Sequence, residues 1–292
     1  MPSLNSNWDK GKNCQITSFE HGNITYLRGE FMKVVILAGG YGTRISEASR
    51  FVPKPMIMIG EYPILWHIMK IFSTYGHNEF IICAGYKSNI IKDYFLNYYL
   101  INSDLTIDLS QRNAIDIHTT NSENWRVTIV DTGLNTMTGG RIRRVRRYVG
   151  NETFLLTYGD GLADVDLHQL VRYHQGHGKI ATVTAVKPPG RFGTLMIDGN
   201  GQVKSFLEKA NETSAWINGG FFVFQPEIFN YLSNDETVLE REPLEQLAAQ
   251  GELMAFQHHG FWQPMDTMRD HALLENLWQQ GKPPWQVWGH SQ

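Results

Sequence analysis

The segment that constrains the fold most begins at Met32, where the apolar run KVVILAGG ends in a glycine-rich loop. A continuous apolar run of this kind is typical of a strand that is buried on both faces of a parallel sheet. Parallel strands need long crossover connections, which are usually helices. The sequence therefore predicts an α/β fold whose first core strand follows Met32.

Strand and helix patterns alternate along the first half of the chain and give way to more strands in the second half. The expected strands lie at residues 79–84, 125–130, 153–157, 179–186, 194–197, 203–207 and 220–224. The expected helices lie at residues 63–72, 88–100, 138–148, 226–233, 240–250 and 268–280. Alternation at this spacing predicts right-handed crossovers and a mostly parallel sheet.

We expect one domain after an N-terminal extension. No repeat, low-complexity linker or sharp change of composition divides residues 32–292, and 42% of all residues are hydrophobic, which is enough for a full core. Residues 1–31 are polar and mixed. They form either an upstream extension or a small capping hairpin, and we assign them no chemistry.

Charge, cysteines and hydropathy exclude several classes of protein. The formal net charge is -3, so no general basic field would gather nucleic acid. The two cysteines, Cys14 and Cys83, have no paired spacing, which favours a reducing cytoplasm over a secreted disulfide scaffold. No apolar run approaches the roughly 18 to 20 residues of a membrane span. We therefore expect a cytoplasmic protein without a nucleic acid or membrane partner.

The loop after the first strand, LAGGYGTR at residues 37–44, is the strongest candidate for a binding site. Its three glycines permit positive φ angles and a close approach of the backbone to phosphate oxygens. The loop matches neither the P-loop pattern GxxxxGK[ST] nor the dinucleotide pattern GxGxxG, which would need a glycine in place of Ile45. Further on, Pro53 and Pro55 stiffen the backbone on each side of Lys54 and limit where its ammonium can reach.

The pairing of LAGGYGTR with this braced PKP resembles the sugar-nucleotide pyrophosphorylases, which join a nucleoside triphosphate to a sugar 1-phosphate. From Met32 to about Trp288 the chain is similar to one branch of that family, the glucose-1-phosphate cytidylyltransferases. The segments that carry the resemblance are LAGGYGTR, PKPM, VDTG with TMTGGR, LTYGDG, PPGRFG, INGGFFV and GFWQPMDTMRD.

The resemblance implies a Rossmann-like, mixed but mostly parallel sheet flanked by helices, with a strand-rich second half. Its nucleotide-binding half would span about 32–178 and its sugar-binding half about 179–292. The implied reaction joins CTP and α-D-glucose 1-phosphate to give CDP-glucose and pyrophosphate, with Mg2+ as the cofactor. The product would feed deoxyhexose synthesis for surface polysaccharide such as the lipopolysaccharide O-antigen, and the assembly would be a homo-oligomer such as a hexamer.

The resemblance also implies roles for individual residues. The nucleotide-binding positions are Leu37, Ala38, Gly39, Gly40, Tyr41, Gly42, Thr43, Arg44, Lys54, Thr136, Arg141 and Gly159. The sugar phosphate positions are Phe192, Gly193, Glu208, Lys209, Asn218 and Gly219. The catalytic positions are Arg44, Lys54 and Asp160, and the metal ligands are Asp160 and Asp266.

The residues themselves fit this chemistry. Asp160 follows an apolar strand and a glycine, so its carboxylate is expected at the carboxyl edge of the sheet, where open α/β sheets bind ligands. Asp266 precedes a helix pattern and is either a second metal ligand or an N-cap. Magnesium is usually held by one or two carboxylates, with water and substrate phosphates as its other ligands. Arg44 and Lys54 would then stabilise charge on the phosphates.

Some assignments remain open at this stage. Arg141 either reads the base, since a donor-only guanidinium suits the acceptors of cytosine, or belongs to the solvated arginine-rich face of a helix. The histidines His168, His174 and His177 are expected on the surface, because no fourth ligand completes a zinc spacing. The residues that bind the phosphates do not distinguish between bases or between sugars, so another nucleotide or another sugar phosphate is an alternative. A non-catalytic sugar-nucleotide sensor is a further alternative.

Overall fold

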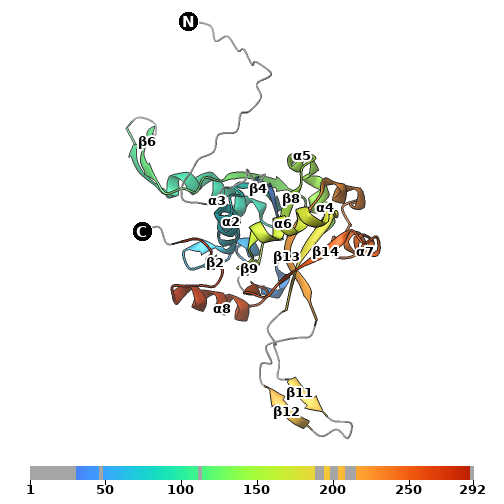
Figure 1. Ribbon diagram of the computed structural model, residues 1–292. Coiled ribbons are helices and arrows are strands. Elements are labelled where there is room, and N and C mark those ends of the chain that lie inside the picture. Colours follow the sequence, from blue (N-terminus) through green and yellow to red (C-terminus); the bar gives the residue numbers. More distant parts are fainter. Residues whose placement is uncertain are drawn as a thin grey trace, which may run out of the picture. The chain divides into compact units, whose positions relative to one another are not determined.

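The computed structural model describes residues 31–45, 49–110, 114–187, 194–197, 203–207 and 215–289. Within them a seven-stranded sheet has the order β14-β10-β13-β8-β1-β4-β7 (Figure 1). Its strands are β1 (Val34–Ala38), β4 (Glu79–Ala84), β7 (Arg126–Asp131), β8 (Phe154–Tyr158), β10 (Ala181–Val186), β13 (Ile217–Phe224) and β14 (Leu253–His258). All neighbours pair in parallel except β13, which is antiparallel to β8 and β10. The predicted mixed, mostly parallel sheet is confirmed.

Helices connect these strands. The α-helices are α2 (Ile64–Thr74), α3 (Ser88–Ile101), α4 (Thr138–Arg144), α5 (Arg146–Val149), α6 (Leu167–His177), α7 (Glu242–Ala249) and α8 (Met268–Gln279). The short 3-10 helices are η1 (Thr43–Ile45), η2 (Lys54–Met56) and η3 (Pro226–Tyr231). The expected helix at 138–148 is interrupted at Val145, and the expected helix at 226–233 is a 3-10 helix.

Four two-stranded ladders complete the described secondary structure. They pair β2 (Met58–Ile59) with β3 (Tyr62–Pro63), β5 (Ser103–Asp108) with β6 (Ala114–Thr120), β9 (Gly161–Ala163) with β15 (Trp262–Pro264), and β11 (Thr194–Ile197) with β12 (Val203–Leu207). The sequence predicted β11 and β12, but it predicted neither α6 nor the β5–β6 hairpin.

The sheet is buried on both faces, as the apolar run at its centre predicted. Alternate residues of β1 enter two different clusters, since side chains along a strand point to opposite faces. Val34 and Ile36 pack in one cluster with α2, α6 and α8, whereas Val35 packs in the other with α4, α5 and α7. The helices therefore cover both faces and leave the carboxyl edge of the strands open for a ligand.

One expectation about a side chain needs correction. His174 lies in the interior, not on the surface, because its ring nitrogens bond to Thr182 Oγ1 at 2.8 Å and Gln225 Nε2 at 2.9 Å. His168 is exposed as expected. Trp285 is fully buried in the core. Among the described residues, no helix has the length and apolar character needed to cross a membrane.

Candidate active site

A cavity of about 530 Å³ opens at the carboxyl ends of β1 and β8. These two strands lie side by side at the point where the strand order reverses, which is where open α/β sheets bind ligands. The cavity is lined by Leu37, Ala38, Gly39, Gly40, Tyr41, Gly42, Thr43, Ile45, Lys54, Pro55, Leu134, Asn135, Thr136, Met137, Thr138, Arg141, Tyr158, Gly159, Asp160 and Asp266. The loop after β1 forms one wall, and the segment after β7 forms another.

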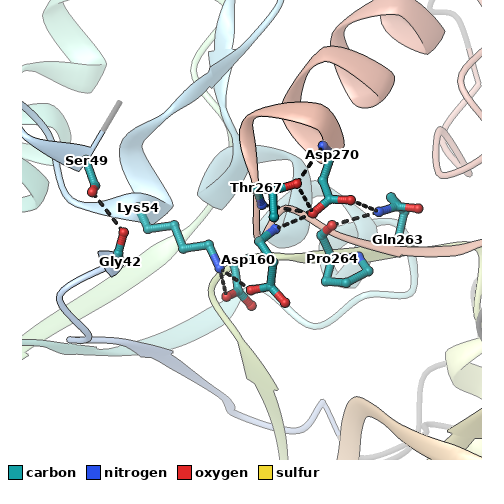
Figure 2. A network of polar contacts seen from close by, with 9 residues as sticks. Gly42, Ser49, Lys54, Asp160, Gln263, Pro264, Thr267 and Asp270 are labelled. Atoms are coloured by element: carbon teal, nitrogen blue, oxygen red, sulfur yellow. Dashed lines mark hydrogen bonds and ion pairs between the residues drawn. The ribbon is translucent and has the colours of Figure 1, made fainter. Parts of the chain in front are cut away.

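The glycine loop has one position that requires glycine for its backbone angle. Gly42 has a φ of 66°, which side-chain-bearing residues rarely adopt, and a Cβ there would lie 3.2 Å from the Cβ atoms of both Lys54 and Ser49. The Gly42 carbonyl accepts from Ile45 N at 3.0 Å and from Ser49 Oγ at 2.9 Å (Figure 2). The turn at Gly42 therefore lies against the Cβ of Lys54.

Lys54 joins the two predicted metal aspartates. Its Nζ lies 2.6 Å from Asp160 Oδ2 (Figure 2). The same Nζ lies 2.8 Å from Asp266 Oδ1. The lysine is 8% exposed, so it is not an ordinary surface lysine. Pro53 is the N-cap of the 3-10 turn that carries Lys54, and Pro55 lies within that turn.

The two carboxylates keep this lysine charged. Burial lowers the pKa of Lys54 and is the largest single effect, but the charges and hydrogen bonds of Asp160 and Asp266 together outweigh it. The pKa of Lys54 is therefore raised above its ordinary value. At neutral pH the cavity end holds one ammonium between two carboxylates.

A short ladder brings the two aspartates together. Gly161 of β9 pairs with Pro264 of β15, and Met265 N donates to the Asp160 carbonyl at 2.8 Å. Asp160 directly precedes this ladder on one strand and Asp266 follows it on the other. The backbone alone thus places their carboxylates side by side.

The turn at Asp266 is fixed by the start of α8. Thr267, not Asp266, is the N-cap, and its side chain forms a capping box with Asp270. Asp270 Oδ2 also accepts from Asp266 N at 3.1 Å, while Oδ1 accepts from Gln263 Nε2 at 3.1 Å. The N-cap interpretation of Asp266 is therefore wrong, and its carboxylate is directed to Lys54.

Arg141 lines the cavity, but its guanidinium donates mainly to the protein. Nη1 donates to Thr132 Oγ1 at 2.7 Å and to the Gly133 carbonyl at 2.8 Å, and Nη2 donates to the Gly39 carbonyl at 3.1 Å. Arg141 is 5% exposed, so it does not belong to a solvated helix face. A Cβ on Gly39 would lie 2.1 Å from Nη1, so glycine is needed there to admit the guanidinium. These contacts make Arg141 a residue that holds the two cavity walls together, and its role in nucleotide binding stays a prediction.

The remaining predicted residues fall into three groups. Thr136 and Gly159 line the cavity together with the glycine loop. Asn218 and Gly219 lie in β13 and are not part of the cavity wall, although Asn218 bonds to Tyr158 at its edge. The side chain of Arg44 and the residues Phe192, Gly193, Glu208 and Lys209 lie outside the described part of the chain.

The sequence did not single out Tyr158 and Thr138 as site residues, yet both line the cavity. The position of Tyr158, directly before Gly159 and Asp160, could have identified it as a site residue. The position of Thr138, directly before the two glycines of α4, could likewise have identified it. Burial is the largest effect that raises the pKa of Tyr158, and nearby Glu240 raises it further, so the hydroxyl stays protonated as a donor.

The donor set fits a hard divalent cation. Asp160 and Asp266 both approach one cation, the Lys54 ammonium, from different strands. Carboxylate oxygens suit Mg2+ and Ca2+, and magnesium needs only one or two protein ligands beside phosphates and water. Where the chain is described, no group of three or more His, Cys, Asp or Glu could form a closed metal cage. Two carboxylates leave room on such an ion for water and phosphate ligands.

The fold and this site together define a class of enzyme, and the comparisons agree. The chain belongs to the nucleotidyl transferase family, whose model matches residues 33–270. Enzymes of this family generally use a divalent metal ion.

Within the family, the chain is similar to two glucose-1-phosphate cytidylyltransferases. The protein of Salmonella typhi is 56% identical over 258 residues, which cover 88% of this chain and 100% of that protein. A probable glucose-1-phosphate cytidylyltransferase of Bacillus subtilis is 48% identical over the same share of both chains.

Solved structures support the fold. HddC from Yersinia pseudotuberculosis has a TM-score of 0.63 and 24% identity, and it covers 85% of this chain and 99% of its own. A UDP-glucose pyrophosphorylase in complex with UDP-glucose has a TM-score of 0.60 and 20% identity, with 86% and 99% covered. At these identities the likeness concerns the fold alone.

Proposed function

We propose that this chain transfers the cytidylyl group of CTP to glucose 1-phosphate and releases pyrophosphate, so that CDP-glucose is formed. The choice of substrates rests on the cytidylyltransferases that match the chain over 88% of its length. The type of chemistry rests on one observation. A buried lysine between two aspartates lies in a cavity that a glycine-rich loop also lines.

The reaction needs no nucleophilic side chain. A phosphate oxygen of glucose 1-phosphate attacks the α-phosphorus of CTP, and the bond from that phosphorus to the pyrophosphate oxygen breaks in line. Catalysis then comes from positioning and from neutralisation of negative charge. Lys54 carries a positive charge at the cavity end, and the glycine loop lets the phosphates approach the backbone closely.

We assign Asp160 and Asp266 as the residues that hold Mg2+. When bound, the ion would neutralise phosphate charge as a Lewis acid. The β9–β15 ladder supports this assignment, because it sets the spacing of the two carboxylates through the backbone. Lys54 then stays beside the phosphates as the protein's own cation.

A pyrophosphate-release assay tests the proposal, with the four nucleoside triphosphates combined with several sugar 1-phosphates and the product identified by mass spectrometry. We expect turnover with CTP and glucose 1-phosphate that is lost after chelation and restored by magnesium. Full activity after exhaustive chelation would contradict the metal assignment. Turnover with a different nucleotide or sugar 1-phosphate would show that the proposed substrates are wrong. Binding without turnover would identify a sugar-nucleotide sensor.

We also propose that the chain acts in the cytoplasm as a homo-oligomer such as a hexamer, and that its product serves the synthesis of O-antigen sugars. An apolar surface at the end of α3 and on the β5–β6 hairpin supports association. Leu96 is 76% exposed, Ile101 75% and Leu109 79%. Ile107 and Ile115, which are cross-strand partners on the hairpin, are exposed as well. Exposed apolar patches mark protein interfaces. Light scattering of the purified protein would test the assembly.

A further inference from the structure

A second polar network lies beside Asp160 at the edge of the cavity. The Tyr158 hydroxyl donates to Glu240 Oε1 at 2.5 Å, and the Thr138 hydroxyl donates to Glu240 Oε2 at 2.7 Å. Asn218 Nδ2 donates to the Tyr158 hydroxyl at 3.1 Å. We call these four residues the Glu240 network. It joins β8, β13, α4 and the segment that precedes α7.

Other contacts fix the direction of these hydrogen bonds. Leu239 N donates to Thr138 Oγ1 at 2.9 Å, so the Thr138 proton is directed to Glu240. Gly220 N donates to Asn218 Oδ1 at 2.9 Å, so the amide nitrogen of Asn218 faces Tyr158. Both hydroxyls thus donate to Glu240, and the carboxylate position is set by groups that line the cavity.

Glu240 has capacity left to accept further hydrogen bonds. A carboxylate accepts only and offers about four lone-pair sites. Within the described part of the chain, the hydrogen bonds to Glu240 are those from Tyr158 and Thr138, one to each oxygen. Glu240 and Asn218 are both exposed. The rim of the cavity therefore presents an oriented acceptor that suits the hydroxyl groups of a polyol.

The Glu240 network reaches both sides of the cavity. Thr138 directly follows the wall at Leu134–Met137, which comes after β7 on one side of β1. Tyr158 and Asn218 come from β8 and β13 on the other side. A ligand that extends from the glycine loop toward β8 and β13 would reach the Glu240 network.

We propose that Glu240 is a specificity-determining residue that accepts hydrogen bonds from hydroxyl groups of the bound hexose 1-phosphate, while Tyr158 and Thr138 hold its carboxylate. This inference rests on the proposed function, because it concerns the sugar half of that reaction. A site built to bond a hydroxyl rejects an analogue that lacks it, since its own polar group is then left unpaired. Ribose hydroxyls offer the same chemistry, so the test must separate the two sources.

The experiment compares kcat/KM for glucose 1-phosphate with kcat/KM for deoxy analogues that each lack one ring hydroxyl. It uses wild type, Glu240→Ala and the control Glu242→Ala, which removes an exposed carboxylate just beyond the network. We expect wild type to disfavour at least one analogue by roughly 10- to 100-fold, the range of one lost hydrogen bond to a charged group. In Glu240→Ala that ratio should fall toward one, whereas Glu242→Ala should keep it.

The results of this experiment show whether Glu240 contacts the hexose, the ribose or neither. Tyr158→Phe should raise KM for glucose 1-phosphate without lowering the melting temperature, because it loosens Glu240 and keeps the ring. Unchanged ratios for every sugar analogue in Glu240→Ala would overturn the inference, and so would a uniform loss of activity with a lower melting temperature. A changed ratio for deoxyribose against ribose CTP alone would assign Glu240 to the nucleotide and overturn the hexose assignment. If wild type does not use CTP and glucose 1-phosphate at all, the proposed function is wrong, and the inference about Glu240, which rests on it, is wrong as well.

Discussion

Lys54→Met removes the ammonium and leaves Asp160 and Asp266 side by side without their shared cation. The Lys54 side chain is 10% exposed, and those of Asp160 and Asp266 are 30% and 19% exposed. Exposed ion pairs contribute about 0 to 1 kcal/mol, whereas breaking a fully buried pair costs about 3 to 5 kcal/mol. This cluster lies between those limits, so we expect a loss of about 2 kcal/mol in the free energy of unfolding.

Thermal unfolding with and without magnesium measures this effect. In a chain of this size about 2 kcal/mol corresponds to a fall of roughly 4 °C in the melting temperature. Magnesium should raise the melting temperature of Lys54→Met more than that of wild type, because it binds carboxylates that have lost their competing ammonium. Turnover should fall by orders of magnitude even with magnesium present. The control is Lys282→Met, which removes an exposed lysine.

The pH dependence gives a further check. The raised pKa of Lys54 means that its contribution is fully present below the unfolded value of about 10.4 and is lost as pH rises through the higher folded value. The stability difference between wild type and Lys54→Met should therefore be constant near neutral pH and shrink above about pH 10.4. Equal melting temperatures for the two proteins, with the same response to magnesium, would refute the reasoning.

Three other predictions concern residues near or far from this cluster. Asp160→Asn should keep the fold, since Lys54 retains Asp266, but lower turnover by orders of magnitude; an unchanged turnover would remove Asp160 from the site. Arg141→Gln should lower kcat/KM for CTP and UTP by the same factor, because the guanidinium holds backbone carbonyls; a changed ratio would restore base reading. Burial lowers the pKa of His67, His77 and His174 to about 4, so the free energy of unfolding should fall between pH 6.5 and 4 by up to about 1.4 kcal/mol per pH unit for each, which denaturant titrations at several pH values would measure.

The buried strands were predictable because burial on both faces leaves a continuous apolar run. The strand expected at 79–84 is β4 with the same bounds. The β5–β6 hairpin was not predicted, because its side chains lie largely outside the core and carry no single apolar face. Helix α6 had usable signals, since Asp166 caps its start and Gly178 ends it with a φ of 64°. Its apolar stripe is completed by the buried His174, a residue type that does not mark a core position by itself.

The candidate site was predictable where it is local in sequence. The glycine loop and Lys54 line one cavity as expected, since their motifs specify turns and a braced side chain. The roles of Arg141 and Glu240 were not predictable, because they depend on contacts across long stretches of chain. Arg141 Nη2 reaches Gly39 across 102 residues, and Tyr158 reaches Glu240 across 82. Sequence patterns report periodicity and turn chemistry, but they do not show which residues that are distant in sequence form hydrogen bonds with each other.

The aspartate pair shows how the fold makes a site that neither motif contains. Asp160 and Asp266 lie 106 residues apart, and each alone is consistent with an ordinary turn. The β9–β15 ladder fixes their backbones before any cation is considered. Two carboxylates held this close repel each other, which raises the free energy of the folded chain unless a cation lies between them. Lys54 supplies that cation in the protein itself, but one ammonium offsets only one of the two carboxylates. The net negative charge that remains would attract the divalent ion that we propose for this site.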